Sequence, residues 1–231
     1  MELLGEGFTK AWQLITSGDP VVFHALGVSL LCSLCSLALA AVLAVPYGAW
    51  LGLARPRGAS LHVFLLRVGL SIPTVVIGLL VYAFFTRRGL LGHLHLFHTQ
   101  AAIVVGQTLL ALPLLASLVH GACASLDPVV AESARTLGAS RAGTAARCLS
   151  EVRPALLTAC LATFGRCLTE VGIAVMVGGA ILLDTRTLTG HVQSEVARGN
   201  FGSALAAGLL LLSVAVPLTL LGMVLERGRR A

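Results

Sequence analysis

The chain has 231 residues, of which 57% are hydrophobic and only 11% charged, and its mean hydropathy is +0.93. Because soluble domains carry about 25% charged residues, this composition excludes an ordinary soluble protein. It predicts one all-α domain whose apolar segments lie in a bilayer. The net charge of +6 does not indicate nucleic-acid binding, because the arginines stand at the ends of apolar runs rather than on one soluble face.

The first 20 residues mix charged and apolar side chains, and they lack the charged start and apolar core of a signal peptide. We expect an amphipathic helix at the membrane surface over 1–20, with Trp12 at the interface. The membrane domain is then 21–225, and a basic tail follows at 226–231.

Five apolar stretches are each long enough to cross a membrane, for which about 20 residues are needed. They cover about 21–53, 61–85, 100–126, 154–183 and 203–225. Pro46 is expected to kink or end the first stretch, and Pro113 to interrupt the third. In the second stretch Ser71, Pro73 and Thr74 predict either a local unwinding that faces a pore or a simple kink.

The segment 127–154, between the third and fourth stretches, is rich in charged residues. Asp127 followed by Pro128 predicts a helix start, and Gly138 a left-handed turn that ends this short helix. Ser140 is placed to cap a second short helix. Two short helices joined by a glycine turn between membrane spans predict a docking element for a soluble partner.

This segment also resembles a known motif. Glu132, Ser133 and Ala134, then three residues and Gly138, resemble the EAA loop of ABC-importer permeases, whose pattern is Glu-Ala-Ala, three residues, Gly. Serine replaces one alanine, and the proline of the family's later Ile-x-Leu-Pro appears here only at Pro154. The resemblance implies a coupling helix that fits a groove on a cytoplasmic ATPase, whereas the alternative is an ordinary interhelical loop. The implied coupling residues are Asp127, Glu132, Ser133, Ala134, Gly138 and Arg141.

Basic residues are distributed unequally between the two sides that five spans define. One side holds nine, Arg55, Arg57, Arg135, Arg141, Arg147, Arg153, Arg227, Arg229 and Arg230, and the other holds five, Lys10, Arg87, Arg88, Arg186 and Arg198. The positive-inside rule makes the first side cytoplasmic. The N-terminus is then outside, and the C-terminus and segment 127–154 are cytoplasmic.

No energy source is encoded in the chain itself. Lys10 is the only lysine, so a Walker A motif, which requires one after its second glycine, is excluded. We expect no enzyme activity and no cofactor bound by this chain, with ATP and magnesium used by a partner subunit. An ion-coupled secondary carrier is the alternative, although the sequence shows no internal repeat typical of that class.

Arg166 and Glu170 are the second chemical feature, because their four-residue spacing puts them on one helix face. Arg166 lies ~18 Å along the helix from Pro154 at 1.5 Å per residue, near mid-membrane. An unpaired arginine side chain at that depth costs ~2.5–17 kcal/mol of free energy, so Arg166 must pair or face water. This face, with Thr169, either lines a route along which Arg166 draws anions, or forms a structural ion pair that locks helices together.

A wider resemblance, from about 22 to 225, is to the permease of tungstate-uptake ABC importers, whose molybdate counterparts are close relatives. It is carried by segments 87–92, 132–140, 151–154, 165–172, 177–181 and 185–189. It implies a type I importer permease that forms a homodimeric pore in the cytoplasmic membrane of a bacterium or archaeon. It also implies an ATPase dimer inside and an extracytoplasmic oxyanion-binding protein. Arg186 and Thr187 are candidate contacts for that protein, with a solvated loop as the alternative.

Two other groups of residues carry weaker signals. His93, His95 and His98 have irregular spacing and no acidic partner nearby, so an outer loop is preferred to a metal site. Cys32 and Cys35 have redox spacing but lie within an apolar span, where small residues serve helix packing. We therefore assign no metal or redox site.

Overall fold

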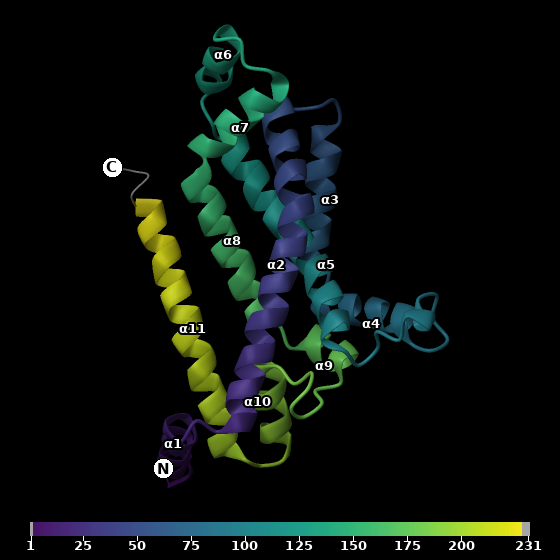
Figure 1. Ribbon diagram of the computed structural model, residues 1–231, viewed down its shortest axis with the longest axis vertical. Helices are drawn as coiled ribbons and strands as arrows, with labels where there is room; N and C mark the ends of the chain where they lie inside the picture. The colour runs from purple at the N-terminus through teal and green to yellow at the C-terminus, as the bar shows by residue number, and fades with distance from the viewer. Residues whose placement is uncertain (1, 228–231) are drawn as a thin grey trace.

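The computed structural model describes residues 2–227, and within that range every regular element is a helix (Figure 1). The helices are α1 (Glu2–Thr16), α2 (Pro20–Ala54), α3 (Ala59–Ser71), α4 (Thr74–Phe85), the 3₁₀ helix η1 (Gly92–Leu94), α5 (Gln100–Ala124), α6 (Pro128–Thr136), α7 (Arg141–Glu151), α8 (Arg153–Leu168), α9 (Gly172–Gly178), α10 (Leu188–Ala197) and α11 (Phe201–Arg227). The bundle is elongated, with α6 and α7 at one end and α1 and α10 at the other (Figure 1).

The pair α2 and α5 forms the centre of the bundle, and small residues bring the two backbones close together. A Cβ added to Gly48 would lie 2.7 Å from the carbonyl oxygen of Ala116, which leaves no space for a side chain. α2 continues through Pro46 and α5 through Pro113, so the expected end and interruption at these prolines are not seen. Proline removes only one backbone donor, and neighbouring helices in a membrane bundle can compensate for it.

A buried polar group ties three helices together. Ser36 Oγ of α2 lies 3.2 Å from Gln107 Oε1 of α5, and Gln107 Nε2 donates to the Cys167 carbonyl of α8 at 3.0 Å. Ser36, Gln107 and Cys167 are all almost fully buried. Such interhelical hydrogen bonds fix the relative position of helices in an apolar environment.

Two of the five predicted spans are broken helices. Three helices are long and apolar enough to cross a membrane, and the number rises to five if each bent pair counts as one span. α3 and α4 meet at a bend of 90°, and α8 and α9 at a bend of 55°. The prediction that the fourth span reaches 183 was wrong, because α9 ends at Gly178 and the left-handed residues Gly179 and Ala180 turn the chain.

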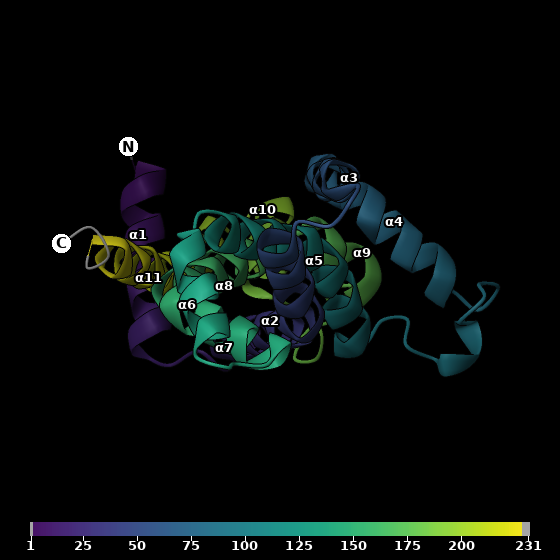
Figure 2. The ribbon, with the colours of Figure 1, turned by 90° about the horizontal axis from the view of Figure 1, so that it is seen from above.

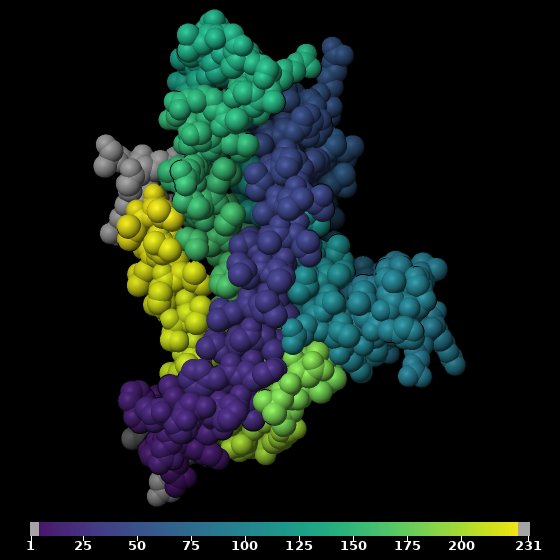
Figure 3. All heavy atoms as spheres, in the orientation of Figure 1, coloured from purple at the N-terminus to yellow at the C-terminus, as the bar shows by residue number. Residues whose placement is uncertain are grey.

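The halves that follow the two breaks pack against each other. A Cβ on Gly78 of α4 would lie 3.4 Å from Ile173 Cα of α9. α4 and the loop after it project sideways from the bundle (Figure 3). α3, by contrast, runs alongside α5 (Figure 1).

α1 packs across the start of α11. A Cβ on Gly7 would lie 2.6 Å from the Phe201 ring, and Phe8 and Trp12 are exposed. The helix is where the sequence predicts an interfacial one, and its position at a membrane surface stays a prediction. Of the predicted basic tail, residues 228–231 lie outside the described residues.

Candidate functional site

The elbow formed by α6 and α7 is built from local capping interactions. The Asp127 carboxylate accepts from the Val129 N–H at 2.9 Å, and the Ser140 hydroxyl accepts from the Gly143 N–H at 3.1 Å. Gly138, between the helices, has φ of 83°. The helix starts and the glycine turn predicted from the sequence are therefore confirmed.

The end of α6 is a Schellman motif. The Ala139 N–H donates to the Ala134 carbonyl at 3.0 Å, and the Gly138 N–H donates to the Arg135 carbonyl at 2.9 Å. Both bonds need the left-handed backbone of Gly138, since they reverse the chain within two residues. The angle between α6 and α7 is thus set by a residue that tolerates positive φ without strain.

Most of the predicted coupling residues are on the surface of this elbow. Ala134 is buried, whereas Asp127, Glu132, Ser133, Gly138 and Arg141 are exposed. Leu137, at the tip, is 88% exposed. Leu137 is thus an exposed apolar side chain among charged ones, at the end of an apolar bundle.

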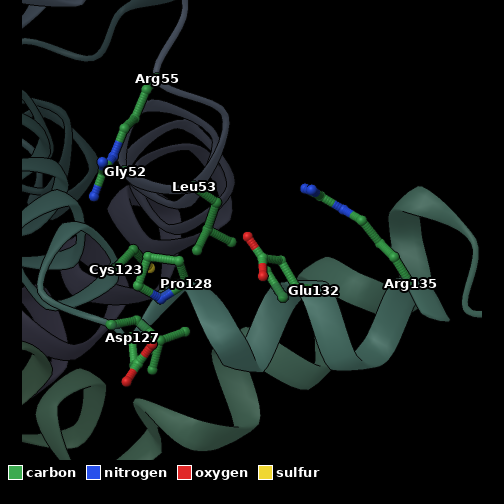
Figure 4. Close-up of a pocket in the computed structure, with 10 residues that line it drawn as sticks. Gly52, Leu53, Arg55, Cys123, Asp127, Pro128, Glu132 and Arg135 are labelled. Carbon is green, nitrogen blue, oxygen red and sulfur yellow. The ribbon is translucent and has the colours of Figure 1, made fainter. Parts of the chain in front are cut away.

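A pocket of about 160 Å³ lies where α6 meets the ends of α2 and α5 (Figure 4). Its lining includes Leu53 and Arg55 from the end of α2, and Asp127, Glu132 and Arg135 from the elbow. Glu132 and Arg135 both extend from α6 on the side where Leu53 lies, near the end of α2 (Figure 4). Charged side chains of the elbow and of the turn after α2 therefore border one space beneath the elbow.

The break between α8 and α9 is organised by Glu170. Its Oε2 accepts from Arg166 Nη1 at 2.8 Å, and its Oε1 accepts from the Ile173 N–H at 3.2 Å. The side chain of Glu170 is 4% exposed and that of Arg166 is 39% exposed. The pair expected from the four-residue spacing is therefore present, with its anionic member buried and its cationic member partly open.

The two helix breaks lie close together. A Cβ on Gly172 would be 3.3 Å from Glu170 Oε1 and 3.5 Å from Thr74 Oγ1, so both oxygens border the same small space. Ser71 and Thr169 are not part of this arrangement. Their hydroxyls donate within their own helices, Ser71 to the Arg67 carbonyl at 3.1 Å and Thr169 to the Gly165 carbonyl at 3.0 Å.

Pro73 is the N-cap residue of α4 and is exposed at the 90° break. The helix is interrupted at this point, as the unwinding interpretation of the second span requires. Which of the predicted path residues a substrate meets stays a prediction.

Arg186 and Thr187, the candidate contacts for a binding protein, are both buried. Arg186 Nε donates to the Ala180 carbonyl at 3.0 Å, and its Nη1 lies 3.7 Å from Glu195 Oε1. The Thr187 hydroxyl caps α10 by accepting from the Gly190 N–H at 3.2 Å. Burial leaves these side chains little surface for a second protein, so their predicted contact role stays a prediction that this arrangement does not favour.

Glu195 is a residue whose importance the sequence did not reveal. It also accepts from Arg198 Nη1 at 3.0 Å and from Asn200 Nδ2 at 2.7 Å, and Asn200 Oδ1 accepts from Lys10 Nζ at 2.9 Å. These bonds connect the loop before α10 to α1 through the turn between α10 and α11. A lone carboxylate in a polar connection gave no signal, because its three partners, Arg186, Arg198 and Asn200, come from separate positions in the chain.

His191 adjoins this cluster on α10, outside the helices that are long enough to span a membrane. Its Nε2 bonds Ser203 Oγ at 2.9 Å, and Nδ1 is buried without a partner among the described residues. Burial lowers the pKa of His191, and the nearby positive charges of Arg186 and Arg198 act in the same direction while Glu195 opposes them.

Among the side chains that the structure describes, those of residues 5–225, no three of His, Cys, Asp or Glu are grouped as a metal site requires. His98, one of the three loop histidines, stacks on Phe97 with ring centroids 3.8 Å apart.

Known proteins resemble this chain both in sequence and in fold. A family described as the binding-protein-dependent transport system inner membrane component matches residues 44–231. The chain is 32% identical to the tungstate uptake system permease protein TupB of Peptoclostridium acidaminophilum, over 93% of this chain and 94% of that protein. It is 34% identical to a probable anion ABC transporter permease protein of Haloferax volcanii, over 84% and 86%. Among solved structures, a chain of the MetNI methionine ABC transporter in an inward-facing conformation has a TM-score of 0.68 at 21% identity, over 94% and 96%.

Proposed function

Because this chain belongs to the family of binding-protein-dependent transport system inner membrane components, we propose that it is the permease of an ATP-driven importer that carries tungstate or molybdate. Family membership confirms the class expected from residues 132–138, a membrane permease subunit. The fold is that of an ABC importer permease. The substrate is taken from the similarity to a tungstate uptake permease over nearly the whole chain, and a permease for another small anion is the second candidate.

The Arg166–Glu170 pair, at the break of a span, is the observation that supports an anionic substrate. Arg166 is held in place by a buried carboxylate, yet 39% of its side chain is open. A guanidinium presents N–H donors in a fork that suits the oxygens of a tetrahedral dianion. The negative charge of Glu170 weakens the attraction between Arg166 and the anion. A weaker attraction favours transport, because a transported ion must leave the site as well as enter it.

The partners follow from the same proposal. The α6–α7 elbow is the dock for a dimeric ATPase that binds ATP and magnesium, and the opposite end, around α10, faces an oxyanion-binding protein. A second copy of this chain completes the pore, and lipid covers the remaining apolar surface. The exposed Leu137 and Glu132 support the docking part of this proposal.

The orientation rests on charge. Arg55, Arg57 and the arginines of the elbow stand at the end of the bundle that carries α6 and α7. By the positive-inside rule that end is cytoplasmic. The N-terminus is then outside the cytoplasmic membrane of the bacterial or archaeal cell, and the C-terminus is inside.

The mechanism transmits motion through the elbow. Closure of the ATPase dimer moves α6 and α7 together, since the Schellman turn at Gly138 holds their angle. α7 continues almost directly into α8, whose far end carries Arg166 and Glu170. Displacement of the elbow is therefore applied to the helix that carries the pair, and the span alternates between outward and inward openings.

Reconstitution tests the proposal. Proteoliposomes containing this chain, its ATPase and the binding protein should accumulate tungstate only with ATP, and molybdate should compete better than sulfate. Reversing the charge of the elbow with Glu132→Arg should reduce ATPase association, while Glu6→Lys at the opposite end should not. Uptake driven by an ion gradient without ATP would favour a secondary carrier instead.

A further inference from the structure

Arg67 lies close to the break of the other broken span, as Arg166 does in its own. Arg166 lies two residues before Leu168, the last residue of α8, and Arg67 lies four residues before Ser71, the last residue of α3. Each broken span therefore carries an arginine within about one helical turn of the end of its first helix. The first half of each span approaches the break from the end of the bundle that carries α6 and α7 (Figure 1).

Arg67 differs from Arg166 in having no carboxylate partner among residues 5–225, whose side chains the structure describes. It is exposed on a helix whose other exposed side chains include Phe64, Leu65 and Val68. An arginine that faces hydrocarbon is costly, and such residues are found facing water, another protein or, near a helix end, the headgroups. The surroundings of Arg67 in the membrane must therefore include at least one of these.

The packing of α3 turns Arg67 away from the bundle core. A Cβ on Gly69 would lie 2.9 Å from Pro113 Cβ, which identifies the face of α3 that packs on α5. Arg67 is two residues from Gly69, about 200° around the helix, so it points off this face. On α8, Cys167 is buried against α5 while the adjacent Arg166 is partly open.

α3 and α8 flank α5 when the bundle is seen from the elbow end (Figure 2). Arg67 is eight residues from the start of α3, about 12 Å, and Arg166 is thirteen residues from the start of α8, about 20 Å. Arg67 is thus the shallower of the two, on the elbow side of Arg166.

We infer that Arg67 is a second anion-guiding residue of the translocation path, which an oxyanion meets between Arg166 and the elbow end. The inference rests on the proposed oxyanion function. Because no carboxylate offsets its charge, Arg67 attracts a dianion more strongly than the Arg166–Glu170 pair does. Two positions of increasing attraction would favour movement of the anion from the middle of the membrane toward the cytoplasm.

Water access at position 67 is the first test. In membrane vesicles containing the complete transporter, Arg67→Cys should react with a charged, water-soluble thiol reagent above the wild-type background, and tungstate should slow the reaction. Leu65→Cys is the matched control, since it is exposed on the same turn but about 200° away. Equal reaction at the two positions, or a reaction at 67 that tungstate leaves unchanged, would overturn the inference.

Transport is the second test. Arg67→Gln should lower ATP-driven tungstate uptake about tenfold, as expected for the loss of one charge-assisted contact, while basal ATP hydrolysis and complex assembly stay at wild-type levels. Arg57→Gln, in the exposed turn before α3, should transport normally. Arg67→Gln uptake equal to wild type contradicts the inference and indicates that Arg67 only anchors α3 at the headgroups.

The two proposals fail in different ways. If the wild-type complex takes up neither tungstate nor molybdate, the proposed function is wrong. If the wild type transports them but the Arg67 variants behave like their controls, only the role of Arg67 is wrong.

Discussion

Glu170 accepts one hydrogen bond from Arg166 Nη1 at 2.8 Å and another from the Ile173 N–H at 3.2 Å. One buried carboxylate thus holds the cation at the end of α8 and, at the same time, the first turn of α9. The backbone carbonyl of Glu170 accepts from the Thr189 hydroxyl at 2.9 Å, so α10 is attached at the same point. Three elements between the elbow and the opposite end of the bundle meet at this residue.

Glu170→Ala should therefore destabilise the protein by about 1–3 kcal/mol, because both bonds to a charged acceptor are lost. Thermal unfolding of the purified protein in detergent measures this. Glu151→Ala is the matched control, since Glu151 also pairs with an arginine four residues away, but both side chains are exposed. It should cost no more than about 0.5 kcal/mol. Equal losses for the two variants would show that Glu170 has no special role at the break.

Gly138→Ala should weaken the elbow by about 1 kcal/mol, because φ of 83° is unfavourable for any residue with a Cβ. The space around Gly138 is open, so the cost is purely one of backbone conformation. Gly143→Ala, inside α7, should be neutral or slightly stabilising, as alanine is the better helix former. Thermal unfolding and ATPase pull-down would measure the two variants; a Gly138→Ala protein that matches wild type in both would contradict the role of the turn.

Gly48→Ala should separate α2 from α5, since the added Cβ would meet the Ala116 carbonyl at 2.7 Å. Overpacking of this kind costs about 1–3 kcal/mol. Gly27→Ala lies in the same helix, where an added Cβ meets nothing within 4 Å. If both variants unfold at the wild-type temperature, α2 and α5 do not approach as closely as the structure shows.

The protein should lose stability as the pH falls from 7.5 to 5.5. Unfolded His191 takes up a proton near its ordinary pKa of about 6.5, whereas burial lowers the pKa of the folded-state imidazole, so acid favours the unfolded chain. His191→Gln should show a smaller loss of unfolding temperature over this interval, and His93→Gln, at an exposed position in η1, should behave like wild type. The same acid sensitivity in His191→Gln would assign the effect to another group.

The elbow was predictable because its interactions are local. Asp127 and Ser140 cap helices that begin at the next residue, and Gly138 turns the chain between them. The Arg166–Glu170 pair was predictable for the same reason, since both residues lie within one helical turn. Composition alone assigned the chain to the membrane, because a soluble surface requires charged residues that this sequence does not have.

The sequence by itself therefore determined the membrane class, the local structure of the elbow and the Arg166–Glu170 pair. The tertiary structure decided that Arg186 is buried against Glu195, that the backbone of α5 packs directly on Gly48, and that the two helix breaks meet at Gly172. Each of these depends on residues from separate helices, whose approach is set by the packing of the whole bundle. No periodicity or motif within a single segment contains that information.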